Sequence, residues 1–270
     1  MKVAYQGEPG AYSEEAGYGY FNDPTMMSKK SFRDVFEAVS SGACQSGLIP
    51  IENSLAGSIH QNYDLLLQNN LYIVGEYLLR VHHCLIGMPG VKLSDIKQAI
   101  SHPQALGQCA GYLNKNDIEP TPVYDTAGSV KMLKEKGERY TAAIASKIAA
   151  EIYDMEILEE GIEDNPENFT RFLEIRAKPV SAEGEVKTSI VFTLQNKPGS
   201  LFKALSVFAL REIDLTKIES RPLPGKPWEY LFYIDFIGAI GKNPAKRALD
   251  HLGEYAQMLR VLGSYPRFNA

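Results

Sequence analysis

The chain has 270 residues, of which 44% are hydrophobic and 10% aromatic, and this is more apolar material than one domain of ordinary size needs for its core. Its 28 basic and 33 acidic residues give a formal net charge of -5, so it lacks the positive surplus that binds nucleic acids or anionic membranes. We therefore expect two domains, no nucleic-acid partner and no membrane partner.

The N-terminal residues run directly into a short strand. Val3–Tyr5 follow Met1 and Lys2 without an apolar signal segment, and no later stretch has the length of a membrane span. We therefore expect a cytoplasmic protein. Cys44, Cys84 and Cys109 are odd in number and far apart, which favours buried, reduced thiols over disulfides.

Residues 1 to about 180 alternate short apolar strands, polar turns and amphipathic helices, which is typical of an α/β domain. Ser31 and Asp34 form a capping-box pattern that predicts the start of a helix. The long apolar run from Leu71 to Met88 has no helix signature and suits a crossing between two lobes. A strand over Phe172–Arg176 then brings the chain back. The sequence thus predicts a two-lobed domain with a cleft.

After a polar linker, Lys178–Val186, the order of elements changes. The predicted elements are a strand over 188–194, a helix over 200–211, strands over 214–221 and 229–237, a helix over 244–258 and a strand over 260–265. This βαββαβ order is ferredoxin-like. Its open strand edges and its bare sheet face predict pairing between subunits, so we expect an oligomer.

Five strand-to-helix turns of the first domain carry small polar residues. They are Gly10–Ser13, Glu52–Ser54, Ser101–Gln104, Asp125–Ser129 and Ser146–Lys147. Open α/β sheets bind ligands at such turns, and helix N-termini attract anions. The same residue types are also ordinary helix caps. Both interpretations stay open for any single turn, and together the turns predict a site for a small anion.

Other chemistries find no support in the spacing of residues. Gly7–Gly10 does not match the dinucleotide-binding pattern, and neither Lys226 nor Lys242 is followed by the Ser or Thr of a phosphate-binding loop. His82 and His83 are adjacent on a predicted strand, so they should point to opposite faces and not chelate a metal. His102, before Pro103 at a helix start, suits a turn or cap better than a catalytic base. We expect neither a metal nor a cofactor.

Six ordered sequence blocks resemble the prephenate dehydratase family, whose members convert prephenate to phenylpyruvate in phenylalanine biosynthesis. The blocks are Gly7–Ser13, Pro50–Ser54 with Gly57–Ser58, Ser101–Leu106 with Gln108–Cys109, Asp125–Ser129, Ala142–Ser146, and Asn168 with Thr170–Phe172. The tail, with Asn196–Leu201 and Glu219–Pro222, resembles the family's ACT regulatory domain, which binds phenylalanine.

The resemblance implies a domain plan. The catalytic domain, 1–180, would be two-lobed like type II periplasmic-binding proteins, with lobe 1 at about 1–78 and 168–180 and lobe 2 at about 79–167. An ACT domain over 188–267 would join the subunits as a homodimer or homotetramer. The activity implied is that of a carbon-oxygen lyase of the hydro-lyase class, acting on prephenate with L-phenylalanine as feedback inhibitor.

The resemblance also implies site residues. Thr170 would be catalytic, as hydrogen-bond donor to the departing hydroxyl of prephenate. The candidates for substrate binding are Ser13, Asn53, Ser54, Ser101, Gln104, Thr126, Ser129, Arg171 and Phe172. Strand alternation points Arg171 away from Thr170 and towards a structural role. The candidates for binding phenylalanine are Asn196, Pro198, Gly199, Ser200, Leu201, Glu219, Ser220, Arg221 and Pro222.

The chain departs from the family pattern at two places. Gly10–Ser13 reads Gly-Ala-Tyr-Ser where Gly-Thr-Phe-Ser is commoner, a version similar to relatives that use arogenate. Gly199–Phe202 reads Gly-Ser-Leu-Phe where Gly-Ala-Leu-Val is usual, which changes the presumed effector pocket. An arogenate dehydratase is therefore one alternative, and a non-catalytic, anion-binding sensor is another. In either enzyme, deletion of the residues after about 185 is expected to leave activity and remove sensitivity to phenylalanine.

Overall fold

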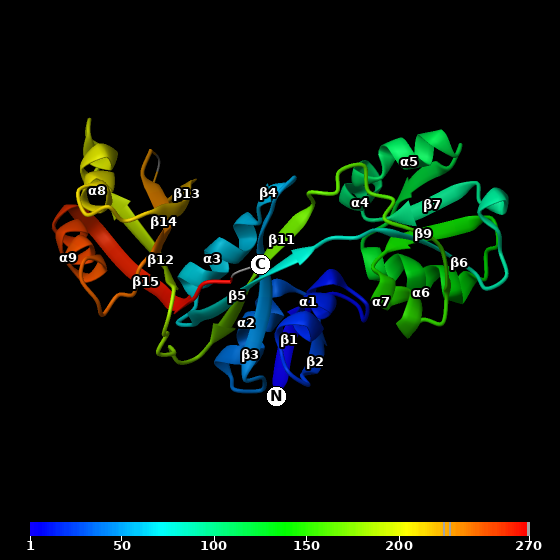
Figure 1. Cartoon of the computed structure of the whole chain (residues 1–270), viewed down its shortest axis with the longest axis horizontal. Helices are drawn as coiled ribbons and strands as arrows, with labels where there is room; N and C mark the ends of the chain where they lie inside the picture. The colour runs from blue at the N-terminus through cyan, green and yellow to red at the C-terminus, as the bar shows by residue number, and fades with distance from the viewer. Residues whose placement is uncertain (224, 227, 269–270) are drawn as a thin grey trace. The chain divides into compact units, whose positions relative to one another are not determined.

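The structure is a computed structural model, which describes residues 1–223, 225–226 and 228–268 (Figure 1). Its contacts divide the chain into two units. Unit 1 contains Met1–Tyr63 and Tyr77–Phe172, and unit 2 contains Asp64–Glu76 and Leu173–Ala270. The described helices include none that is long and apolar enough to cross a membrane.

The first sheet has the strand order β2-β1-β3-β11-β5, and β4 pairs with β3. Its strands are β1 (Lys2–Gln6), β2 (Thr25–Lys29), β3 (Ser46–Asn53), β4 (Gly57–Ser58), β5 (Tyr72–Arg80) and β11 (Phe169–Arg176). Helices α1 (Tyr12–Tyr20), α2 (Phe32–Ser40) and α3 (His60–Gln68) alternate with them. Strand β1 runs parallel to both β2 and β3, as an α/β alternation requires. The boundary between the two units falls inside α3, β5 and β11.

The second sheet lies in unit 1 and has the order β10-β6-β9-β7-β8. Its strands are β6 (Cys84–Gly87), β7 (Gln98–Ser101), β8 (Glu119–Pro122), β9 (Thr141–Ala145) and β10 (Glu156–Glu160). Its helices are the 3-10 turn η1 (Leu93–Asp95), α4 (Pro103–Gln108), α5 (Ala110–Lys115), α6 (Thr126–Lys136) and α7 (Lys147–Ile152). The core of this sheet is built largely from alanine, valine, isoleucine and leucine of its strands and helices.

Local sequence explains several of the element ends. The predicted capping box is present at α2, where the Ser31 hydroxyl accepts from Asp34 N and the Asp34 carboxylate accepts from Ser31 N. Asp125 caps α6 in the same way, and Gly137 ends that helix in the left-handed conformation at φ 66°. The three cysteines are free and buried, as predicted.

Unit 2 contains a four-stranded antiparallel sheet of order β13-β14-β12-β15 (Figure 1). Its elements are β12 (Val186–Leu194), α8 (Ser200–Ala209), β13 (Leu215–Pro222), β14 (Tyr230–Ile237), α9 (Ala245–Tyr255) and β15 (Ala256–Pro266). Both helices pack on one face of the sheet, around Phe192, Phe208 and Phe236. The predicted βαββαβ order is confirmed, and with the two α/β sheets so is the predicted fold class.

The segment Asp64–Glu76 packs against this sheet and therefore belongs to unit 2. The guanidinium of Arg260 on β15 donates to the carbonyl oxygens of Leu67 and Asn69, at 3.0 and 2.6 Å. These carbonyls lie at the end of α3, where the last turn of a helix leaves acceptors unpaired. Arg260 therefore closes the C-terminus of α3.

One local prediction needs correction. The long apolar run contains two strands, because β5 ends at Arg80 and β6 begins at Cys84. His82 and His83 consequently lie between strands and not on one, although only His83 is buried. The predicted return strand is present, and it begins three residues earlier, at Phe169.

Candidate active site

A cavity of about 760 Å³ opens in unit 1 between segments of both its sheets. Its walls come from the turns after β1, β2, β7 and β8, from β3 and β11, and from residues around His83. The lining residues that matter below are Tyr12, Ser13, Lys30, Asn53, His83, Gln104, Gln108, Asp125, Thr126, Thr170 and Phe172. Four of the five predicted turns therefore converge on one cavity. The fifth, Ser146–Lys147, does not line it, and Ser146 Oγ donates instead to the carbonyl oxygen of Gly10 at 2.6 Å.

Asn53, at the end of β3, is held in one orientation. Its Oδ1 accepts from the backbone N–H groups of Leu55 and Ala56, at 3.1 and 2.9 Å. Its Nδ2 must then face β11, where it lies 3.0 Å from Thr170 Oγ1. An amide nitrogen can only donate, so the Thr170 oxygen accepts from Asn53. The hydroxyl hydrogen of Thr170 is thereby left to donate elsewhere.

A chain of hydrogen bonds extends from Asn53 along the cavity wall. Asn53 Nδ2 donates to Asn168 Oδ1 at 2.8 Å, and Asn168 Nδ2 donates to Gln108 Oε1 at 3.1 Å. Gln108 Oε1 also lies 2.8 Å from His83 Nε2, and His83 Nδ1 lies 2.7 Å from the Tyr12 hydroxyl. Residues from α1, α4, β3 and β11 are thus joined by one network.

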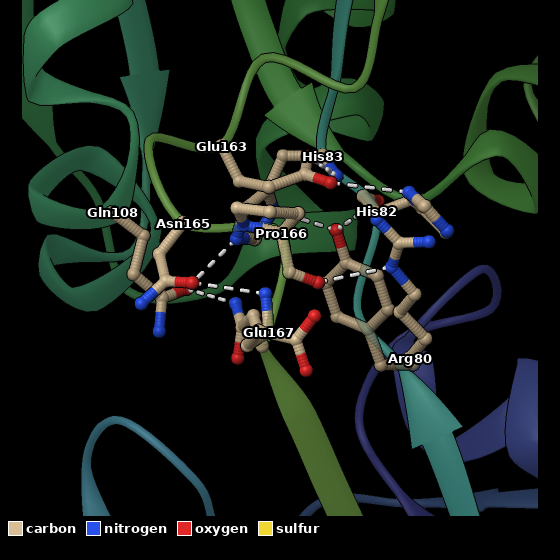
Figure 2. Close-up of polar contacts among 10 residues, drawn as sticks. Arg80, His82, His83, Gln108, Glu163, Asn165, Pro166 and Glu167 are labelled. Atoms are coloured by element: carbon tan, nitrogen blue, oxygen red, sulfur yellow. Dashed lines mark hydrogen bonds and ion pairs between the residues drawn. The ribbon is translucent and has the colours of Figure 1, made fainter.

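Polar contacts next to this network join the segment before β6 to the segment after β10 (Figure 2). Glu163 accepts from His83 N at 2.9 Å through Oε2 and contacts His82 Nδ1 at 3.1 Å through Oε1. Arg80 Nε donates to the carbonyl of Pro166 at 3.0 Å. The residues before β6 and after β10 therefore lie side by side, and this fixes the position of His83.

Charge in the cavity is sparse. Asp125 is the one acidic side chain among the described lining residues, and Lys30 is their one lysine or arginine. Burial raises the pKa of Asp125, although the N–H of Gly128, 2.6 Å from its Oδ1, works in the opposite direction. Burial also lowers the pKa of His83, which favours its neutral form.

The structure brings six of the ten predicted catalytic and substrate-binding residues into the cavity. These are Ser13, Asn53, Gln104, Thr126, Thr170 and Phe172. Thr170 and Phe172 line it while Arg171 between them does not, which matches the alternation of a strand. Arg171 is instead buried outside the cavity lining.

Three predicted serines also lie outside the cavity lining, and their hydroxyls bond to the backbone. Ser54 Oγ donates to the carbonyl of Glu167 at 2.7 Å. Ser101 Oγ donates to Ile144 O, and Ser129 Oγ donates to Thr126 O, each at 2.6 Å. A hydroxyl that already donates its proton to the backbone holds a turn together and is not directed at a ligand.

Five of the lining residues named above were not predicted as site residues. Three of them, Tyr12, Gln108 and Asp125, lie inside sequence blocks that resemble the family, and those blocks were a signal that could have identified them. His83 and Lys30 carried no such signal, because their position depends on contacts between distant segments. Among the described residues, no three His, Cys, Asp or Glu side chains gather as a metal would require.

The predicted effector segments lie in unit 2. Asn196–Leu201 form the turn from β12 into α8, where Gly199 takes the left-handed conformation at φ 79°. Glu219–Pro222 end the edge strand β13, and their register with β14 places them at the same end of the sheet as that turn. Arg221 forms an ion pair with Asp64 at 3.1 Å. Phe202, in the first turn of α8, and Leu210, directly after its last residue, are exposed.

Comparison with known proteins places both parts of the chain. The family model described as prephenate dehydratase matches residues 3–180, and the ACT domain model matches residues 188–253. The Arabidopsis thaliana protein named arogenate dehydratase/prephenate dehydratase 2, chloroplastic, is 47% identical over 277 residues, which cover 98% of this chain and 73% of that protein.

Solved structures agree with these matches. The prephenate dehydratase from Arthrobacter aurescens in complex with L-Phe is 31% identical, with a TM-score of 0.91 over 99% of this chain and 90% of that chain. A structure described as a novel type of quorum quenching acylase is 35% identical, with a TM-score of 0.93 over 98% of both chains.

Proposed function

The chain belongs to the prephenate dehydratase family of hydro-lyases, and on this premise we propose that it converts prephenate to phenylpyruvate in the cavity of unit 1. The observation that carries the proposal is the Asn53–Thr170 hydrogen bond of 3.0 Å. Because Asn53 is the donor in this bond, the Thr170 hydroxyl is free to donate to a leaving oxygen.

The reaction requires few contributions from the protein. The bond from the ring to its carboxylate breaks, and its electron pair enters the ring as carbon dioxide leaves. The bond from the ring to its hydroxyl breaks at the same time, and hydroxide departs with its electron pair and takes a proton from the solvent to become water. Because the ring becomes aromatic, the protein needs only to orient the substrate and to stabilise the departing oxygen.

Thr170 supports this step as a hydrogen-bond donor. An aliphatic hydroxyl is too weak an acid to give up its proton near neutral pH, so the bond strengthens as charge develops on the leaving oxygen. Phe172, which follows on the same side of β11, offers an apolar wall to the ring.

The carboxylates of the substrate are proposed to bind near the start of α1. The N-cap residue of this helix is Ala11, whose side chain cannot cap it, so the first N–H groups of α1 are available to an anion. Ser13 lies in this first turn and Lys30 lines the same cavity. Gln104 and Thr126 complete the set of polar groups that we assign to the substrate.

Arogenate is the second candidate substrate, and Asp125 favours it. Arogenate carries an ammonium group where prephenate carries a ketone, so a carboxylate in the cavity wall has a partner only in arogenate. Asp125 is the one described lining residue with this charge. The name of the Arabidopsis relative includes both activities.

A two-substrate assay tests the proposal. The purified protein is given prephenate or arogenate, and phenylpyruvate and phenylalanine are measured. Formation of phenylpyruvate from prephenate supports the proposal, and formation of phenylalanine from arogenate alone supports the second candidate. An N-acyl amide belongs in the same assay, because one similar structure is described as an acylase. Protection of the protein by prephenate without any product would indicate a binding protein.

Feedback by phenylalanine at the ACT domain is part of the proposal. The support is the complex of the Arthrobacter aurescens enzyme with L-Phe and the position of Asn196–Leu201 and Glu219–Pro222 at one end of the sheet. We assign the ammonium group of phenylalanine to Glu219. Inhibition curves for the wild type and for Glu219→Gln test this, since a lost ammonium contact should weaken inhibition without changing the uninhibited rate.

Assembly, domain limits and compartment complete the proposal. The exposed Phe202 and Leu210 and the edge strand β13 suit pairing of two ACT domains, which light scattering of the purified protein will show as a dimer or a tetramer. The predicted lobes, 1–78 with 168–180 and 79–167, are tested by limited proteolysis. The Arabidopsis relative is named chloroplastic, so the predicted cytoplasmic location needs a direct test by fractionation of the source cells.

A further inference from the structure

The hydrogen-bond chain in the cavity wall has a fixed direction, and it ends on two residues that have no role in the reaction described above. We propose that His83 and Tyr12 are positioning residues which hold Gln108 with its amide NH₂ towards the cavity. The consequence for binding rests on the proposed function, because it concerns a carboxylate of the substrate. The direction of the chain does not depend on that function.

Backbone N–H groups next to Asn53 set the direction of the hydrogen-bond chain at that end. The N–H groups of Leu55 and Ala56 can only donate, so they fix Asn53 Oδ1 as the acceptor. Asn53 Nδ2 is therefore the donor to Asn168 Oδ1. Asn168 is fully buried, so its remaining Nδ2 needs an acceptor within the protein, and it finds Gln108 Oε1 at 3.1 Å.

Gln108 is oriented by this chain. Since its Oε1 accepts from Asn168, its Nε2 has two hydrogens and no hydrogen-bond partner among the described residues. Gln108 also lines the cavity. An amide NH₂ that faces an anion site is a donor for a carboxylate. The opposite orientation would place an oxygen there and repel the same group.

His83 also holds Gln108 in this orientation. Its Nε2 lies 2.8 Å from Gln108 Oε1, which is an acceptor, so Nε2 must carry a hydrogen. In a neutral imidazole the other nitrogen, Nδ1, is then an acceptor. The Tyr12 hydroxyl lies 2.7 Å from Nδ1 and 2.9 Å from the carbonyl oxygen of His82, and its one hydrogen can go to only one of them. Because the Nε2–H form of a neutral imidazole leaves Nδ1 without a hydrogen, we assign the hydrogen of Tyr12 to Nδ1. The phenol of Tyr12 thus stabilises the Nε2–H tautomer of His83.

The charged and titratable groups around His83 are few. Glu163 accepts from its backbone N–H, and His82 is its neighbour in the chain (Figure 2). Burial lowers the pKa of His83, while Glu163 and the bond to Gln108 act against that shift. Glu15, Cys84 and Cys109 face Tyr12, whose own pKa burial raises well above 10. Tyr12 therefore keeps its proton and remains a donor.

Direct observation of the tautomer is the first test. The full-length protein is labelled with ¹⁵N-histidine, and the two imidazole nitrogens of His83 are assigned by comparison with the His83→Gln variant. We expect the Nε2–H form at pH 8, with Nδ1 unprotonated. An Nδ1–H form would overturn the proposal, whatever substrate the enzyme uses, because Gln108 would then have to turn its oxygen to the cavity.

Two substitutions of His83 form a matched pair. The amide of Gln reaches the position of the imidazole Nε2 and retains a donor to Gln108. The amide of Asn reaches only the position of Nδ1 and retains only the contact with Tyr12. We expect His83→Asn to raise KM for prephenate about tenfold with little change in kcat, and His83→Gln to stay within about threefold of wild type.

The KM values of these two variants decide whether the proposal holds. Equal losses in both variants, or wild-type KM in His83→Asn, would overturn it, because neither outcome fits a donor required at Nε2. Thermal melts show whether both variants are folded. If His83→Asn does not fold, the tautomer measurement on the wild type decides alone. If prephenate is not converted, the proposed function fails, and the tautomer still tests the direction of the chain.

Discussion

The ammonium group of Lys187 lies 2.7 Å from Glu76 Oε1 and 2.8 Å from Glu76 Oε2, and both side chains are buried in unit 2. Lys187 is on β12 of the ACT domain, and Glu76 is on β5, which follows α3. Each charge loses its hydration on folding and is compensated by the other. The pair therefore makes the ACT sheet and the segment Asp64–Glu76 depend on each other.

Loss of one partner should cost more than the pair contributes. In Lys187→Met the buried carboxylate of Glu76 loses the ammonium group that contacts both its oxygens, and we expect the free energy of unfolding to fall by about 3 kcal/mol or more. Urea denaturation measures this. The matched control is Lys147→Met, which removes a pair with Glu160 that is 57% exposed on both sides and should cost less than about 1 kcal/mol. Equal losses would contradict the argument.

Thr170 offers a test of the hydrogen bond to the leaving oxygen. Thr170→Val keeps the shape of the side chain and removes the hydroxyl, so kcat should fall by roughly two to three orders of magnitude with little change in KM. Thr170→Ser keeps the hydroxyl and should retain most of the rate. Steady-state kinetics with the preferred substrate measure both. A Thr170→Val enzyme with wild-type kcat would remove Thr170 from the mechanism.

Asp125 offers a test of substrate choice. Asp125→Asn keeps an oxygen that can cap α6 and removes the negative charge, so the protein should remain folded. If Asp125 meets the ammonium of arogenate, the ratio of kcat/KM for arogenate to that for prephenate should fall about tenfold or more. The control is Asp34→Asn, which changes another capping carboxylate, outside the cavity lining. An unchanged ratio in Asp125→Asn would show that the carboxylate does not contact substrate.

Glu15 gives unit 1 a pH-dependent stability. Burial and the charge of Glu151 raise the pKa of Glu15 to about 7. Between about pH 4.5 and 7 the folded state therefore holds a proton that the unfolded state has released, so the free energy of unfolding falls as pH rises through this range. Glu15→Gln removes this loss and should be more stable than wild type by about 2 to 3 kcal/mol at pH 8.

The two proteins should be equally stable near pH 4, where Glu15 is protonated in both states of the wild type. Denaturation curves at pH 4 and pH 8 give the comparison. Glu37→Gln, on the exposed face of α2, should show no such dependence. If the advantage of Glu15→Gln is the same at both pH values, the raised pKa is not its cause.

Spacing patterns in the sequence predicted the structural features that depend on residues close together in the chain. The capping box of Ser31 and Asp34, the order of elements after Val186 and the alternation that separates Thr170 from Arg171 all follow from short-range spacing. The blocks shared with the family added Asn53 and Gln104 to the candidate site. The first three features are present in the structure because one turn of a helix or one step of a strand decides them.

Contacts between distant segments could not be predicted in the same way. Ser54 and Ser101 were predicted from the same kind of strand-to-helix turn as Ser13, and only the backbone oxygens to which they donate show that they do not face the cavity. His83 meets Tyr12 across 71 positions of sequence. No spacing rule connects them, because their contact depends on how the segment before β6 passes α1.

Gly263, on β15, lies against the backbone of Ile73 on β5, so closely that a Cβ at this position would overlap the carbonyl oxygen of Ile73. Gly263→Ala must therefore move one of two backbones, and we expect a loss of about 1 to 3 kcal/mol in the free energy of unfolding. Gly253, on the exposed face of α9, has nothing within 4 Å of such a Cβ. Gly253→Ala should be neutral or stabilising by up to about 1 kcal/mol, because alanine favours a helix.

The same contact changes the expectation for a chain cut after about residue 185. Such a fragment would leave Glu76 without Lys187, the C-terminus of α3 without Arg260 and the backbone of Ile73 without β15. We therefore expect the fragment to be less stable than the whole chain, so its activity alone does not report on regulation. Gly263→Ala is a smaller perturbation, because it disturbs one contact and leaves the ion pair of Lys187 with Glu76 in place. If its unfolding curve matches that of the wild type, the close packing of β15 on β5 is not required for stability.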